Sequence, residues 1–207
     1  MRWSATLVLM AAVGLGAAPA LRAQLPGRDP LTRGEANAMR SAAGNPGKRV
    51  KLLLKFAGQR LSRLQSLQAS HLPGRRSTMH LMLRQYREIL NELDDNFDTW
   101  MSGWRTSEMS GPPKLKKPLH QAIKAEQGFL ITLAAVRKHS TPAELRTYRF
   151  ALSDAQDATR SHIKDAQDDW AKIQHRQAEQ KAAKKKHKHF PFFAALSPAP
   201  RRMPLHA

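Results

Sequence analysis

The chain has 207 residues, with 35 Lys and Arg against 16 Asp and Glu, and it contains no cysteine. Hydrophobic residues make up 41% of the sequence and charged residues 25%, which is typical of a folded protein with one domain-sized core. The lack of cysteine excludes disulfides, thiol catalysis, cysteine-ligated metals and covalent haem attachment. The formal charge of +19 favours an anionic partner such as nucleic acid, phospholipid or an acidic polymer of the cell envelope.

Residues 1 to 23 have the pattern of an export signal. Arg2 precedes a charge-free stretch from Ala5 to Ala20, and small residues precede two candidate cleavage sites, after Ala20 and after Ala23. We prefer cleavage after Ala23, which predicts a periplasmic or secreted protein. A retained anchor is the alternative, because about 16 apolar residues fall short of the roughly 20 that a spanning helix needs. A helix belonging to the fold is the remaining possibility.

Residues 24 to 44 predict a flexible or weakly helical lead-in, in which Glu35 to Ala43 can form a short helix with little to anchor it. Asn45-Pro46 indicates a better helix start, because Asn caps well and Pro suits the first helical position. We therefore expect a first long helix from Pro46 to Gln68. Its core stripe is Val50, Leu53, Leu54, Ala57, Leu61 and Leu64, widened by Leu52, Phe56 and Leu67.

A second long helix, from Thr78 to Trp104 with Ser77 as its cap, carries the strongest apolar stripe. Apolar residues recur with a period near 3.6, and the opposite face is charged. The stripe is Met79, Met82, Leu83, Tyr86, Ile89, Leu90, Leu93, Phe97, Trp100, Met101 and Trp104. We expect Leu93 and Trp100 in the core, because both lie near the centre of this stripe.

Two further helices follow a basic loop that ends at Pro118. The third has the stripe Leu119, Ala122, Ile123, Leu130, Leu133 and Ala134, flanked by Phe129 and Val136. The fourth starts at Thr141-Pro142-Ala143-Glu144, in which Thr can cap the helix and Glu can return a hydrogen bond to the cap. Its stripe is Leu145, Tyr148, Leu152, Ala155, Thr159, Ile163, Ala166, Trp170 and Ile173.

No alternating strand pattern occurs in the sequence, so we predict an all-α protein. Four long amphipathic helices joined by turns indicate an antiparallel four-helix bundle at residues 45 to 180. Residues 181 to 207 contain a lysine run and then four prolines without a helical period. This composition predicts a flexible, disordered basic tail.

The sequence motifs favour a protein without catalytic, cofactor or metal sites. Di-iron bundles need Glu-x-x-His pairs, and none occurs; the sequence also lacks a P-loop and a Gly-x-Ser-x-Gly elbow. His162, with Asp165 one turn later, lies at the edge of the fourth stripe, where a structural histidine is far commoner than a haem or metal ligand. Phe150 lies off its stripe and is either a scattered surface residue or part of a partner contact. We expect seven carboxylates to lie on solvated faces: Asp94, Asp95, Asp98, Asp154, Asp157, Asp165 and Asp168.

The basic tail is the most suggestive functional feature. In the sequence its cationic residues are followed directly by aromatic residues, a combination that occurs in interfacial membrane contacts. The predicted binding residues are Lys181, Lys184, Lys185, Lys186, Lys188, Phe190, Phe192 and Phe193. The leading hypothesis is an exported, non-enzymatic helical protein that binds an anionic membrane surface, an envelope polymer or a partner protein. The alternatives are a cytosolic nucleic-acid-associated protein and a bundle that binds haem or a metal without covalent attachment.

Overall fold

The computed structural model describes residues 29–70, 72–106 and 115–188. The described chain is all-helical and contains no β-strand, which confirms the predicted fold class. Its helices are α1 (Arg33–Ser41), α2 (Pro46–Ala69), α3 (Arg75–Thr106), α4 (Lys116–His139) and α5 (Pro142–Lys188). The expected signal sequence at residues 1 to 23 lies outside the described residues.

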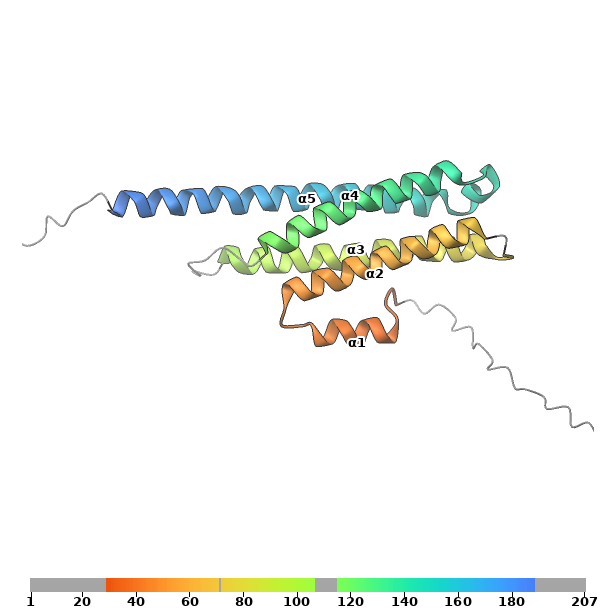
Figure 1. Ribbon diagram of the computed structural model, residues 1–207, viewed down its shortest axis with the longest axis horizontal. Helices are drawn as coiled ribbons and strands as arrows, with labels where there is room; N and C mark the ends of the chain where they lie inside the picture. The colour runs from red at the N-terminus through yellow and green to blue at the C-terminus, as the bar shows by residue number, and fades with distance from the viewer. Residues whose placement is uncertain (1–28, 71, 107–114, 189–207) are drawn as a thin grey trace, which may run out of the picture.

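The four long helices lie lengthwise beside one another, and α1 lies on the outside (Figure 1). α2 packs against α3 and α4, α5 packs against the same two helices, and α1 packs against α2. Consecutive long helices run in opposite directions in Figure 1. At one end of the molecule α5 extends past the ends of the other helices (Figure 1).

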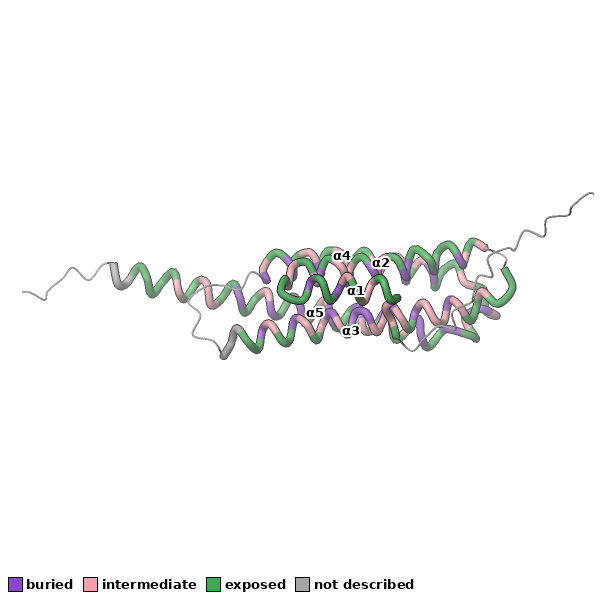
Figure 2. The backbone as a smooth tube through the Cα atoms, turned by 90° about the horizontal axis from the view of Figure 1, so that it is seen from below, coloured by how far each residue is buried: buried purple, intermediate pink, exposed green. Residues whose placement is uncertain are grey.

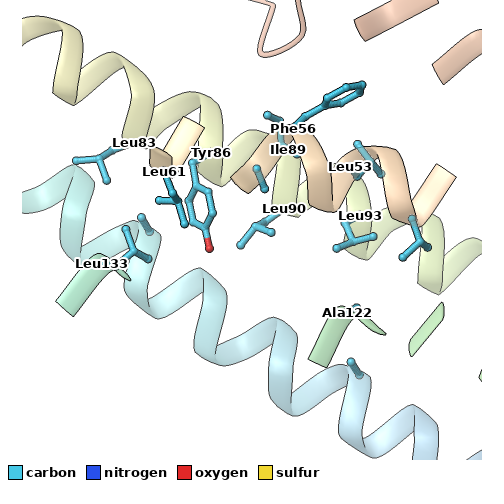
Figure 3. Close-up of a cluster of buried hydrophobic side chains, with 14 of the residues drawn as sticks. Leu53, Phe56, Leu61, Leu83, Tyr86, Ile89, Leu90, Leu93, Ala122 and Leu133 are labelled. Carbon is cyan, nitrogen blue, oxygen red and sulfur yellow. The ribbon is translucent and has the colours of Figure 1, made fainter. Parts of the chain in front are cut away.

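α3 contributes the largest share of the apolar core, as its stripe predicts. Figure 3 shows Leu83, Tyr86, Ile89, Leu90 and Leu93 of α3 between side chains of α2 and those of α4. Leu93 is 1% exposed, so its predicted core position is confirmed. The buried residues of α3 are Met79, Leu83, Tyr86, Ile89, Leu90, Leu93, Phe97 and Met101.

Trp100 departs from the expected core position, because its side chain is only half-buried. Its ring meets the ring of Phe97 edge-on, with centroids 5.8 Å apart, rather than lying between helices. Phe97 and Met101 occupy the inward positions on either side, so Trp100 lies at the margin of the core.

The predicted helix caps of α2 and α5 are confirmed. Asn45 Oδ1 accepts a hydrogen bond of 2.9 Å from the backbone N–H of Lys48. Thr141 and Glu144 form the expected capping box, with the Thr141 N–H donating to Glu144 Oε2 at 2.8 Å. α3, however, begins at Arg75 rather than Thr78, because Gly74 takes a left-handed conformation (φ 74°) that ends the turn before it.

α1 is held more firmly than the sequence indicates. Thr32 and Glu35 form a capping box at its start. The guanidinium of Arg60, which is 8% exposed, donates to both carboxylate oxygens of Glu35 at 2.9 and 2.6 Å and to the carbonyl of Pro30 at 2.9 Å. This bidentate, largely buried pair fastens α1 to α2 at a place where few apolar side chains are available.

The buried stripe of α4 differs from the prediction. Leu130 is half-buried and Ala134 is exposed, so assigning them to the core was wrong. The buried residues of α4 are Pro118, Leu119, Ala122, Glu126, Leu133 and Val136. Leu119, Ala122 and Leu133 are buried as predicted, whereas Glu126 occupies an inward position that a search for apolar residues alone misses.

We predict that Leu93→Ala lowers the free energy of unfolding by about 2 to 5 kcal/mol, because it leaves a cavity in the apolar core. Ile131→Ala is the matched control, since Ile131 is an aliphatic side chain that is 73% exposed. It should change stability by less than about 0.5 kcal/mol. Urea unfolding followed by circular dichroism measures both. Equal midpoints for the two variants would contradict this core.

Candidate functional site

The end of α5 leaves the core of the protein. α5 has 47 residues, whereas α2 and α4 have 24 each and α3 has 32. Ile173 is the last buried residue of α5, and every later side chain that the structure describes is exposed or half-buried. Figure 2 shows this projecting end with largely exposed residues. The last four turns of α5 are therefore available to a partner.

The lysine run belongs to this projecting helix. The expected tail boundary at Gln180 does not hold, because α5 continues to Lys188. Alanine and lysine are strong helix formers, and cations at a helix C-terminus interact favourably with the helix dipole. The expected tail residues Phe190, Phe192 and Phe193 lie outside the described residues.

The helix arranges four of the five lysines on one side. At about 100° per residue, spacings of three, four and seven place Lys181, Lys184, Lys185 and Lys188 on one face, while Lys186 lies elsewhere. We call these four residues the lysine face. Lys181, Lys184 and Lys185 are exposed; the side chains of Lys186 and Lys188 lie outside those described.

The surroundings of the lysine face leave its charge unneutralised. Residues 172 to 188 contain seven Lys and Arg and a single acidic residue, Glu179. Glu179 lies 3.5 Å from Nδ1 of His175. Among the described side chains, neither Lys181 nor Lys184 nor Lys185 forms an ion pair. The face therefore presents a dense positive charge to solvent.

A second group of polar side chains lies inside the protein. Tyr86 Oη and Thr159 Oγ1 are 2.8 Å apart and fully buried, and Thr159 also donates to the carbonyl of Ala155 at 2.6 Å. The hydroxyl of Tyr86 points toward α5 (Figure 3). Glu126 is 1% exposed and His162 is 7% exposed. We call Tyr86, Glu126, Thr159 and His162 the interior polar layer.

Burial decides the protonation of the interior polar layer. It raises the pKa of Glu126 to about 8, with a further rise from the nearby Asp94. Burial likewise raises the pKa of Asp94 to about 6, assisted by Asp98, so the expectation of a fully solvated Asp94 was wrong. Burial lowers the pKa of His162, although the neighbouring Asp165 opposes this change. At pH 7 Glu126 is therefore largely protonated and His162 is neutral.

Two members of the interior polar layer have a buried polar atom without a partner in the described part of the chain. Oε2 of Glu126 and Nδ1 of His162 have no hydrogen-bond partner among the described residues. No three His, Cys, Asp or Glu side chains lie close enough to hold a metal ion within ranges 29–70, 72–106 and 115–188. Three surface hollows lie near the α2–α3 turn, beside Phe150 and beside Lys117, and neither Glu126 nor His162 lines any of these three.

We predict that Glu126→Gln stabilises the protein at alkaline pH. The pKa of Glu126 is raised on folding, so its contribution to stability is present below about pH 4.5 and is lost as the pH rises through about 8. Gln cannot ionise, so the variant should lose this dependence. At pH 9 the gain is at most about 5 kcal/mol, at about 1.4 kcal/mol per pKa unit.

His162 gives the opposite dependence, since its lowered pKa reduces stability as the pH falls below about 6.5. The measurement is therefore the difference in urea unfolding between parent and variant from pH 5 to 9. Glu179→Gln, at an exposed position, is the control and should leave the profile unchanged. Parallel profiles for parent and Glu126→Gln would show that Glu126 is ionised and hydrated in the folded protein.

Comparison with known proteins adds no assignment to these surfaces. Within the described ranges, no helix combines the length and apolar character needed to cross a membrane. No protein-family model matches the chain, and no similar protein is found among curated proteins or solved structures.

Proposed function

We propose that this is an exported, non-enzymatic helical protein that binds an anionic membrane surface through the lysine face. The observation that carries the proposal is the continuation of α5 past Ile173 to Lys188, with Lys181, Lys184 and Lys185 exposed on one side. Export is supported by the signal-like sequence of residues 1 to 23.

The lysine face is better suited to binding an extended anionic bilayer surface than to binding a small ligand. Each lysine near an anionic bilayer contributes roughly 1 kcal/mol, and a helix presents its lysines together without first having to order a chain. The attraction falls off within a Debye length of about 8 to 10 Å, so binding should weaken steeply with salt. Phe190, Phe192 and Phe193 follow directly in the sequence and would add apolar insertion.

In this proposal the four long helices are an antiparallel four-helix bundle that serves as a rigid base for the projecting end of α5. Support comes from the contacts of α2 and α5 with both α3 and α4. The Glu144 carboxylate of the capping box also pairs with Arg75 at the start of α3, which ties the first turn of α5 to its neighbour. The base would hold α5 while its far end meets the membrane.

We predict that the triple variant Lys181→Gln, Lys184→Gln, Lys185→Gln binds vesicles containing phosphatidylglycerol about 100-fold more weakly at low salt. This estimate follows from roughly 1 kcal/mol per lysine. The matched control replaces Lys55, Lys124 and Lys164 by Gln, which removes the same charge from exposed positions on three helices. Co-sedimentation across a salt series measures both.

The control should lose affinity much less than the lysine-face variant. Equal losses for the two variants would mean that net charge alone drives binding. Binding of the parent to duplex DNA but not to vesicles would favour the nucleic-acid alternative, in which the same lysines contact phosphates.

For the export part of the proposal, the expected mature protein begins at Gln24. The intact mass of protein recovered from the periplasm or medium of an expressing bacterium measures this directly. An exported species that still begins at Met1 would contradict cleavage and favour the retained anchor.

A further inference from the structure

Two exposed apolar side chains lie at the end of the protein opposite the lysine face. Among the described residues, three large apolar side chains are more than 60% exposed: Leu72 (61%), Phe150 (69%) and Ile131 (73%). Leu72 lies in the turn before α3, and Phe150 lies in the third turn of α5. The starts of α3 and α5 lie together at the end of the molecule away from the projecting end of α5 (Figure 1).

Arginines surround these two apolar residues. Helical spacing places Arg76, Arg84 and Arg87 on one face of α3, and Arg146 and Arg149 beside Phe150 on α5. A hollow of about 530 Å³ brings Leu72 and Arg76 next to Thr147 of α5. A second hollow, of about 250 Å³, brings Arg84 and Arg87 next to Phe150. We call these five arginines, with Leu72 and Phe150, the arginine face.

Much of the charge of the arginine face is free. Arg84 and Arg87 form exposed pairs with Glu88 and Asp154, at 3.7 and 3.2 Å; such pairs contribute little free energy, so an external anion can compete for both arginines. Arg76, Arg146 and Arg149 are exposed and have no ion pair in the described part of the chain.

Arg149 holds its guanidinium 4.5 Å from the ring of Phe150, so this aromatic side chain has a cation directly against it. Residues 72 to 88 and 137 to 154 together contain eight Lys and Arg against three acidic residues. This end of the protein is therefore strongly positive and carries exposed apolar groups within the charge.

Along α3 and α5, several exposed carboxylates lie between the arginine face and the lysine face. Asp95 and Asp98 of α3 are exposed, as are Asp157, Asp165 and Asp168 of α5. At about 100° per residue, Phe150 lies roughly 140° around α5 from Lys181, so a bilayer that meets the lysine face does not also meet Phe150. Phe150 and Lys185 are about 50 Å apart along the helix, at about 1.5 Å per residue. The two basic ends therefore suit two separate surfaces better than one.

We propose that the arginine face is a second contact for an anionic membrane, and that the protein tethers two bilayers through its opposite ends. Phe150 and Leu72 insert between lipids while the arginines bind head-group phosphates. The exposed Leu72 favours lipid over nucleic acid, because an aliphatic side chain cannot stack on a base. The tether rests on the proposed function of the lysine face, whereas the arginine-face contact stands without it.

The first test uses an environment-sensitive fluorophore attached to Phe150→Cys, since the chain has no other cysteine. With phosphatidylglycerol vesicles its emission should shift to shorter wavelength and at least double, and with phosphatidylcholine vesicles it should not change. Ile131→Cys is the matched control, because Ile131 is equally exposed but lies outside the arginine face. Equal responses at both positions, no response at Phe150→Cys, or a response to DNA alone would overturn the membrane contact.

The second test is clustering of phosphatidylglycerol vesicles, measured by light scattering, with circular dichroism as a check of folding. The parent should cluster vesicles, and the triple variant Arg146→Gln, Arg149→Gln, Phe150→Ser should cluster them at least fivefold less while still co-sedimenting through the lysine face. Clustering at the parental level would overturn the tether.

The lysine-face variant separates the tether from the proposed function. Loss of clustering with the Phe150→Cys response retained supports both. If that variant instead clusters vesicles like the parent, the lysine face is not one of the two contacts and the tether is wrong. The Phe150→Cys response then still decides the arginine-face contact.

Discussion

α5 is longer than the helices that pack against it, and this difference in length determines which of its residues are buried. A helix buries side chains only where neighbours cover it, and α5 has 47 residues against 32 in α3 and 24 in α4. Its buried stripe accordingly ends at Ile173. An apolar stripe continuing beyond that point would be exposed, and the chain instead carries lysines and alanines, which keep the helix without a core. The first part of α5 therefore contributes side chains to the core, and its last part forms a projecting, positively charged surface.

Polar groups inside the protein constrain how the helices pair. The hydrogen bond between Tyr86 and Thr159 joins α3 to α5 and forms in one register only, because a shift by one turn separates the two hydroxyls. Arg60 with Glu35, and Arg75 with Glu144, similarly connect α2 to α1 and α3 to α5. Burial raises the pKa of Glu126 and lowers the pKa of His162, so both side chains are favoured in their neutral forms. The fold thereby avoids the free-energy cost of burying a charge.

The sequence predicts the helical class, the caps at Asn45 and Thr141 and the α3 stripe, because these depend on local spacing and local hydrogen bonds. Prediction from the sequence fails where contacts with residues distant in the sequence determine whether a side chain is buried or paired. Glu126 is buried because α4 turns that position inward, and an apolar pattern misses it. The attachment of α1 to α2 depends on the ion pair between Glu35 and Arg60, which lies 25 residues later in the sequence. The lysine run was expected to be disordered, although alanine and lysine both have high helix propensity.

The central claim is that one face of a helix, rather than an unstructured charged tail, meets the membrane. A scan of single spin-labelled cysteines from Gln177 to Lys188, with lipid accessibility measured by power saturation on phosphatidylglycerol vesicles, tests it most directly. If one helix face meets the membrane, accessibility to lipid should oscillate with a period near 3.6 residues and be greatest at positions 181, 184, 185 and 188. Uniform accessibility along the segment, or maxima on the opposite face, would contradict it.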